Sequence, residues 1–299
     1  MDRYWGLNCL GHDASLCVIE DNKIIWHKLS SEYSGIPNDN YLNQEIINDA
    51  LKFGDPNLIC YYEDHWKKKH RQLCSGEWRK AFNLLTPKLH LIEYGIYFPL
   101  VSIEHHRSHA AAGYFTSNFK DAVVLVADAI GEWETLTVWL SEDNRLSKVE
   151  SKEYPYSLGL FYSAFTKLFN LQPMKDESKV MEYSKSGNPY KYYDRVKSYL
   201  TKNLHKGITD WKDTQDIFDI SASVQLVFEE ELISYADRYK HLSDNMVLMG
   251  GCAYNKLAVN KISKLFNNTY VIKNPGDSSS SIGAVAGYLN KRLKYEIRC

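Results

Sequence analysis

The sequence predicts an α/β protein built from two duplicated lobes that face each other across a cleft. The segments from Tyr4 to Trp26 and from Ala122 to Val149 both run strand, polar loop, strand, turn, strand. Both copies turn at the same three residues, Glu-Asp-Asn, and both carry an acid in the loop between their first two strands. The rest of the chain mixes helical and strand periodicities. We therefore expect the paired loops to meet in the cleft.

The first lobe is expected to span residues 1–117. Its strands are predicted at residues 4–10, 16–19 and 23–26, with the polar loop at Gly11–Ser15, and further elements are a helix at 42–53 and a strand at 58–62. The alanines after His109 favour a helix that closes this lobe.

The second lobe is expected to span residues 118–299. Strands are predicted at 122–127, 133–140, 145–149 and 246–249, and helices at 157–169, 225–239 and 278–289. The last of these helices is rich in small residues, so it could pack closely on a sheet, including that of the first lobe.

Net charge and hydropathy argue against a nucleic-acid-binding protein that relies on overall charge and against a membrane protein. The 299 residues carry a formal net charge of −1, so no global field attracts nucleic acid or membrane surfaces. Mean hydropathy is −0.42, and no apolar run approaches the roughly 20 residues that span a bilayer. No signal-peptide pattern opens the chain, and six scattered cysteines lack a C-x-x-C pair. We expect a cytoplasmic protein without a membrane partner.

His105 and His109 are candidate metal ligands. Residues four apart share a helix face, and neutral imidazoles suit a divalent metal such as iron or zinc. Asp128 follows an apolar strand and could supply a carboxylate to the same site. The alternative interpretation is a polar helix start with surface histidines.

A glycine turn indicates a second candidate site. Gly250 and Gly251 follow a predicted strand and precede a helix that carries Asn255, an arrangement that lets backbone amides approach a phosphate. A tight strand-to-helix turn would explain the same glycines. Asp277 opens the last helix, where it could cap the N-terminus or add a further metal ligand.

Six motifs in order resemble one family. They are H-H-x-x-H-A-A, D-x-x-G-E-W, Y-P-x-S-L-G-L-x-Y-S-A-F-T, K-V-M, G-G-x-A-x-N and P-G-D, starting at His105, Asp128, Tyr154, Lys179, Gly250 and Pro275. This is the pattern of the O-carbamoyltransferases of antibiotic and nodulation-factor biosynthesis, including the tobramycin carbamoyltransferases, and the opening Gly11–Ser15 fits it too. The chain is more distantly similar to the actin/Hsp70/sugar-kinase superfamily, whose two RNase H-like lobes enclose a nucleotide.

The resemblance implies a metal held by His105, His109, Asp128 and Asp277, with iron(II) expected and zinc or manganese as alternatives. It also implies ATP or AMP between the lobes, against Gly250, Gly251 and Asn255, with Glu132 as a further nucleotide contact. An exposed loop acid is the alternative interpretation of Glu132.

The implied reaction moves a carbamoyl group from a carbamoyl-adenylate to a hydroxyl. His12, Asp128 and Lys179 are the expected catalytic residues; His12 would position the carbamoyl group or take the acceptor proton. Without the resemblance His12 is a turn residue and Lys179 a solvated lysine. Family members usually carry a second domain that makes the adenylate from carbamoyl phosphate and ATP. We therefore expect either a separate adenylate-forming protein or direct use of carbamoyl phosphate, with a homo-oligomer also open.

The acceptor is not specified by these motifs. A run of basic residues with tryptophan, Trp66–Arg71 and Trp78–Lys80, could bind the phosphates of a nucleic acid, such as DNA with a hydroxymethylated base, or form a solvated helix face. A small-molecule hydroxyl is the other acceptor. Two alternative functions stay open: a tRNA threonylcarbamoyl transferase-like enzyme, and a non-catalytic nucleotide-binding subunit of a carbamoylating complex.

Overall fold

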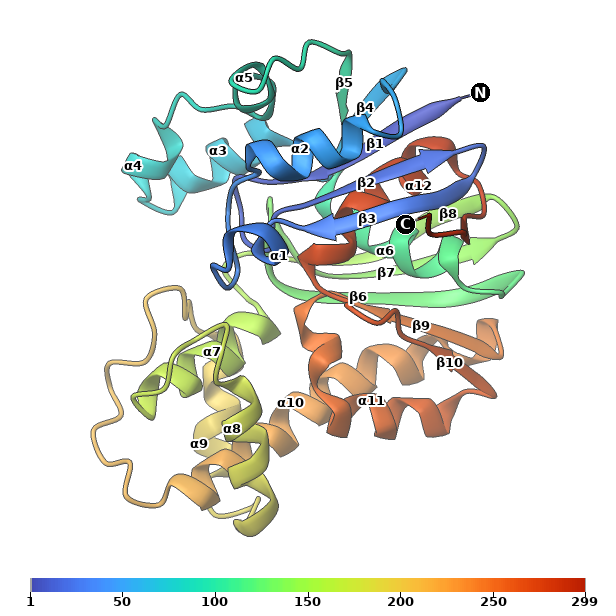
Figure 1. Ribbon diagram of the computed structural model, residues 1–299. Helices are drawn as coiled ribbons and strands as arrows, with labels where there is room; N and C mark the ends of the chain where they lie inside the picture. The colour runs from blue at the N-terminus through green and yellow to red at the C-terminus, as the bar shows by residue number, and fades with distance from the viewer. Residues whose placement is uncertain (1, 299) are drawn as a thin grey trace.

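The computed structural model describes residues 2–298, and a first sheet of six strands forms its upper half (Figure 1). The strand order is β11-β3-β2-β1-β4-β5, and β1 pairs antiparallel with β2 and parallel with β4. The strands are β1 (Arg3–Asn8), β2 (Ser15–Glu20), β3 (Lys23–Leu29), β4 (Leu58–Tyr61), β5 (Leu100–Ser102) and β11 (Lys294–Tyr295).

A second sheet of five strands repeats this plan, in the order β10-β9-β6-β7-β8. Its strands are β6 (Asp121–Gly131), β7 (Glu134–Glu142), β8 (Arg145–Glu153), β9 (Asn245–Met249) and β10 (Asn268–Tyr270). In both sheets three consecutive strands form an antiparallel meander, and the first of them also pairs with the first of two parallel strands. The order β3-β2-β1-β4-β5 therefore corresponds to β8-β7-β6-β9-β10. The predicted duplication is confirmed.

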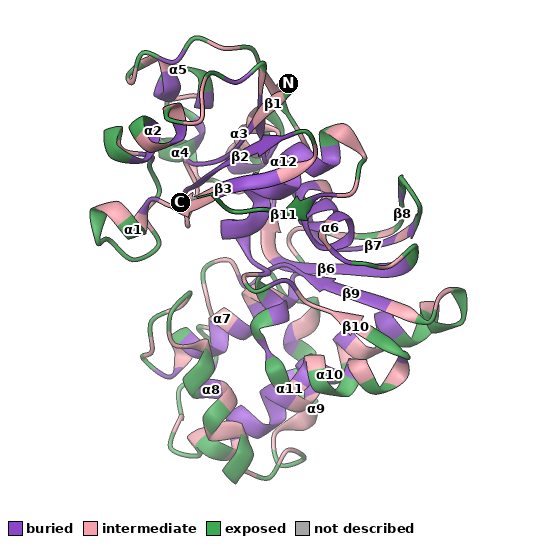
Figure 2. Cartoon of the chain, turned by 45° about the vertical axis from the view of Figure 1, so that its right-hand side comes forward, coloured by how far each residue is buried: buried purple, intermediate pink, exposed green. Residues whose placement is uncertain are grey.

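Two helices, α6 (His105–Thr116) and α12 (Ser280–Leu289), lie between the sheets and pack on each other (Figure 2). α12 packs on β1 and β4 of the first sheet, and α6 on β6 and β9 of the second. At Gly283 a Cβ atom would lie 1.8 Å from the carbonyl oxygen of Ser108, so glycine permits this close approach. The chain then returns to the first sheet, where β11 pairs with β3.

The remaining helices cover the outer faces (Figure 1). Beside the first sheet are α1 (Ser31–Ser34), α2 (Gln44–Leu51), α3 (His65–Cys74), α4 (Trp78–Ala81) and α5 (Pro87–Ile92). Beyond the second sheet are α7 (Leu158–Leu168), α8 (Glu177–Tyr183), α9 (Tyr193–Lys197), α10 (Ile217–Tyr239) and α11 (Lys256–Ile262). The 3₁₀ turns are η1 (Ser184–Ser186), η2 (Ser198–Thr201), η3 (Lys240–Leu242), η4 (Gly251–Tyr254), η5 (Ser263–Leu265) and η6 (Asp277–Ser279).

Most predicted elements are confirmed, and α10 is the largest difference. It begins at Ile217, eight residues before the predicted start at Gln225. The prediction missed this first part because residues 220–225 are all buried and show no amphipathic period. The edge strands β5, β10 and β11 are two or three residues long, too short for a periodic signal. Across residues 2–298, none of the helices has the length and apolar character that a bilayer crossing requires.

Candidate active site

Four buried side chains from three parts of the chain converge at the N-terminal end of α6. His105 and His109 come from α6, Asp128 from β6 and Asp277 from η6, and one ligand atom of each lies within 4.8 Å of all the others. The Nε2 atoms of the two histidines are 3.1 Å apart. Nε2 of His109 lies 3.1 Å from Oδ2 of Asp128 and 3.0 Å from Oδ1 of Asp277.

These residues fit a divalent metal ion. Donor atoms bound tetrahedrally at 2.0–2.1 Å lie about 3.4 Å apart, and the histidine-to-carboxylate distances here are 3.0–3.4 Å. Two imidazoles with two carboxylates form a donor set suited to iron, zinc or manganese. Burial by itself would raise the pKa of Asp277, but His12, His105 and His109 lower it to about 2, so this carboxylate is held ionised.

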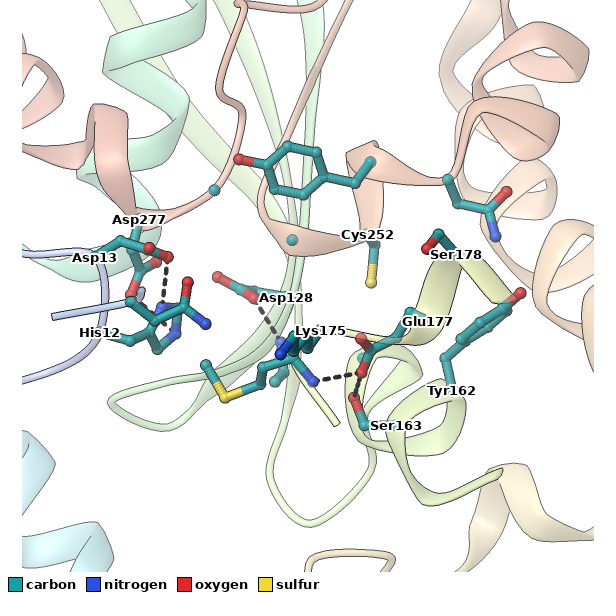
Figure 3. Close-up of a pocket in the computed structure, with 18 of the residues that line it drawn as sticks. His12, Asp13, Asp128, Tyr162, Ser163, Lys175, Glu177, Ser178, Cys252 and Asp277 are labelled. Atoms are coloured by element: carbon teal, nitrogen blue, oxygen red, sulfur yellow. Dashed lines mark hydrogen bonds and ion pairs between the residues drawn. The ribbon is translucent and has the colours of Figure 1, made fainter. Parts of the chain in front are cut away.

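His12 lies beside this cluster on the loop between β1 and β2 (Figure 3). Its Nε2 is 3.4 Å from Oδ2 of Asp277, and its Nδ1 is 3.0 Å from Oδ2 of Asp13. Burial lowers the pKa of His12, but the two carboxylates outweigh it and raise the pKa to about 9. The structure thus brings the loop histidine to the candidate metal ligands.

A cavity of about 340 Å³ leads from this cluster into the second lobe. Figure 3 shows His12 and Asp277 at one side, Asp128 in the middle, and Tyr162 with Glu177 at the other side. Gly251, Cys252, Tyr254 and Asn255 complete its wall on the glycine turn. The cavity size is typical of a small-molecule or cofactor site.

The glycine turn has a structural requirement of its own. Gly250 has φ +85°, and a Cβ atom there would lie 2.2 Å from the carbonyl oxygen of Ala127. Asn255 caps α11 by accepting from the Ala258 amide and exchanges hydrogen bonds with Gln225. A Cβ atom on Gly251 would lie 3.0 Å from Oδ1 of Asp128. The glycine turn is therefore adjacent to the candidate metal ligands.

Two predicted site residues lie elsewhere. Glu132 does not line the cavity; its carboxylate accepts hydrogen bonds from the backbone amides of Asp64 and His105, at the starts of α3 and α6. Burial raises the pKa of Glu132 to about 7. Lys179 has a side chain that is 54% exposed and pairs with Asp176. The structure does not bring Lys179 to the metal cluster or the cavity.

We expect Glu132→Ala to lower the free energy of unfolding by about 1–3 kcal/mol, because it leaves two helix-start amides without an acceptor. Urea unfolding followed by circular dichroism measures this. Glu153→Ala, an exposed position on β8, is the matched control and should change stability by less than about 0.5 kcal/mol. Equal midpoints for the two variants would contradict the assignment.

Sequence reasoning missed the far end of the cavity. Glu177 accepts hydrogen bonds from Ser163 Oγ at 3.0 Å and from the Met174 amide at 2.7 Å. Ser163 and Tyr162 belong to the motif at Tyr154–Thr166, and Glu177 stands two residues before Lys179. Tyr162 and Ser163 were therefore within a motif, but periodicity does not reveal which of its residues face the cavity, and Glu177 lies just outside the next motif.

The basic run on α3 is largely paired. Lys67 pairs with Glu104, Lys68 with Glu63 and Arg71 with Glu77. Trp66 and Trp78 remain 71% and 60% exposed. Because most of its charges are neutralised within the chain, this run concentrates less positive potential than its sequence predicts.

Comparison with solved structures identifies the fold. The activator of 2-hydroxyisocaproyl-CoA dehydratase from Clostridium difficile aligns over 96% of this chain and 95% of its own, with a TM-score of 0.53 and 14% identity. HypF from T. kodakarensis aligns over 98% of this chain and 48% of its own, with a TM-score of 0.53 and 13% identity. The chain has the predicted actin/Hsp70/sugar-kinase-like fold.

Sequence comparison identifies the family. The family described as "Carbamoyltransferase N-terminus" matches residues 61–210 and 194–286. Protein sll1178 of Synechocystis is 31% identical over 66% of this chain and 38% of its own length. Nodulation protein NolO of Bradyrhizobium diazoefficiens is 25% identical over 61% of this chain and 37% of its own, so the chain spans well under half of these relatives. It belongs to the carbamoyltransferase family and matches that family's N-terminal domain.

Proposed function

We propose that this chain is the catalytic domain of an O-carbamoyltransferase that transfers a carbamoyl group from a carbamoyl-adenylate to an acceptor hydroxyl. The observation that carries the proposal is the buried cluster of two histidines and two aspartates at the end of a cavity whose wall includes the glycine turn. Membership of the carbamoyltransferase family supports the reaction class.

The nucleotide is proposed to lie in the cavity between the metal cluster and Glu177. Support comes from the dehydratase activator, which has the same fold and whose structure contains bound ADPNP. Gly251 exposes backbone next to Asp128, which suits a phosphate, and the apolar and hydroxyl groups near Tyr162 suit the nucleoside.

In this proposal His105, His109, Asp128 and Asp277 hold the metal, which would polarise phosphate oxygens of the adenylate. The acceptor oxygen attacks the carbamoyl carbon, the bond from that carbon to the phosphate oxygen breaks, and AMP leaves. His12, beside Asp277, orients the carbamoyl group as a protonated ring, in keeping with its pKa of about 9; it takes the hydroxyl proton only after it has lost its own. Lys179 has no direct contact with the substrate in this proposal, because it pairs with Asp176 on the surface.

The carbamoyl donor and the acceptor are part of the proposal. The donor is an adenylate made outside this domain, or carbamoyl phosphate itself. The acceptor is a small-molecule hydroxyl or a hydroxymethylated base; the paired charges on α3 favour the small molecule. A non-catalytic subunit would not need four intact ligands, so we rank that alternative below the transferase. The family match favours an O-carbamoyltransferase over a threonylcarbamoyl transferase.

Mass spectrometry tests the function. The protein is incubated with ATP, carbamoyl phosphate and a panel of sugars, nucleosides and hydroxymethylated DNA, and each acceptor is examined for an added carbamoyl group. A product that depends on the protein supports the proposal. If adenylate supplied ready-made also yields no product on any acceptor, carbamoyl transfer by this domain is wrong.

We expect Gly251→Val to weaken nucleotide binding by at least tenfold, because a branched side chain would fill the space beside Asp128. Titration calorimetry with ADP measures the affinity. Ala258→Val, buried on α11 outside the cavity, is the control for a volume increase in the same segment. Unchanged affinity in Gly251→Val, with normal affinity in the control, would contradict the placement.

A further inference from the structure

Glu63 lies behind the candidate metal ligand His105, on the side away from the cluster. It follows β4, its side chain is 3% exposed, and its Oε2 is 3.9 Å from Nδ1 of His105. That Nδ1 is buried and has no hydrogen-bond partner, whereas Nε2 of the same ring faces Asp128 and Asp277. The ring thus presents one nitrogen to the cluster and the other to a carboxylate.

The surroundings of Glu63 hold its carboxylate in this direction. Oε1 accepts hydrogen bonds from Lys68 Nζ at 2.6 Å and from Tyr61 Oη at 2.9 Å. Lys68 balances the charge of the buried carboxylate, which would otherwise be costly to keep from water. Both of these bonds go to Oε1, so Oε2 remains directed at His105.

The chemistry of the pair selects one tautomer of His105. An ionised carboxylate only accepts hydrogen bonds, so an imidazole nitrogen facing it is favourable only when that nitrogen carries a proton. With the proton on Nδ1, the lone pair of a neutral ring is on Nε2, which is the atom that faces the cluster. His109 has a comparable arrangement, with Ser280 Oγ 3.4 Å from its Nδ1.

We propose that Glu63, supported by Lys68, is the positioning residue of the metal centre: it accepts the Nδ1 proton of His105 and so keeps Nε2 free to bind the metal. The inference rests on the metal site proposed above. It also gives part of the basic run on α3 a role, since Lys68 balances a charge inside the fold. Carboxylates placed behind ligating histidines commonly raise metal affinity about 10–100-fold.

Zinc binding tests the proposal. Zn²⁺ affinity of metal-stripped protein is measured by competition with a chromophoric chelator. We expect Glu63→Gln to weaken it about 10–100-fold. The double variant Glu63→Leu with Lys68→Met removes the ion pair without leaving an unpaired charge, and should show a similar loss even if the single variant folds poorly. Glu134→Gln is the matched control, because Glu134 is buried and contacts Lys148 and Ser151 but no histidine.

The nitrogen chemical shifts of His105 in the zinc-loaded wild type give a readout that a purely structural role would not move. We expect the proton on Nδ1 in the wild type and a changed Nδ1 signal in Glu63→Gln. Wild-type zinc affinity in both Glu63 variants would overturn the positioning role while leaving the metal site intact. A wild-type protein that binds no zinc, iron(II) or manganese would overturn both.

Discussion

Replacing His109 with alanine is expected to remove the bound metal and to lower the rate of carbamoyl transfer by at least about 10³-fold. His109 is fully buried, and its Nε2 lies within 3.1 Å of Asp128, Asp277 and His105. His106, the other histidine of this turn of α6, is not placed to replace it, because its Nδ1 faces Thr137 Oγ1 at 2.9 Å. A metal that polarises a phosphate contributes several kcal/mol, and each 1.4 kcal/mol is about tenfold in rate.

Elemental analysis and transfer kinetics on the same preparations test this expectation. His90→Gln is the control, since His90 is also buried but lies on α5 and hydrogen-bonds to the Leu42 amide. The control should retain wild-type metal content and rate. If His109→Ala carries as much metal as the wild type, the cluster is not the metal site, whatever the effect on transfer.

Replacing His12 with asparagine is expected to lower transfer by about 10²–10⁴-fold while metal content stays at the wild-type level. His12 approaches the cluster only through the outer oxygen of Asp277, 3.4 Å away, and so is not needed to hold the ion. Asparagine keeps a hydrogen-bonding group of similar size on the loop but cannot carry the positive charge that a pKa of about 9 gives the His12 ring at neutral pH.

Metal content, nucleotide affinity and transfer rate are measured for His12→Asn and for the wild type. We expect metal content and nucleotide affinity to match the wild type and only the transfer rate to fall. Asp13→Asn, which removes the partner of Nδ1, should reduce the rate by a smaller factor. If His12→Asn transfers at the wild-type rate, His12 has only a structural role in the loop.

The duplication and the histidine pair could be predicted from the sequence, because both depend on residues close together in the chain. Each meander has apolar strand segments and the same Glu-Asp-Asn turn, and the two histidines have a helical spacing. Asp128 and Asp277 were candidate ligands from their places at a strand end and a helix start, but the family resemblance was needed to join all four residues in one site, because the two aspartates are distant in the chain and converge through the folding of both lobes.

The supporting carboxylates could not be predicted in the same way. Glu63, Glu132 and Glu177 are single acids in ordinary loop or helix positions, and their roles depend on which amide, lysine or imidazole the fold brings opposite them. Glu132 illustrates the limit: its motif pointed to the nucleotide, whereas its carboxylate joins the starts of two helices. Burial all round likewise hid the first two turns of α10.

α12 and β11 come late in the sequence but pack on the first sheet, which affects when that sheet can be completed during synthesis. β1, β2 and β4 leave the ribosome early, yet the helix that packs against them is made of residues 280–289. Until that helix emerges, side chains that face it, such as Tyr4 on β1 and Cys17 on β2, lack the cover that it provides in the folded protein. The first sheet is therefore complete only after residues 280–289 have been translated, and until then its uncovered face is open to chaperones.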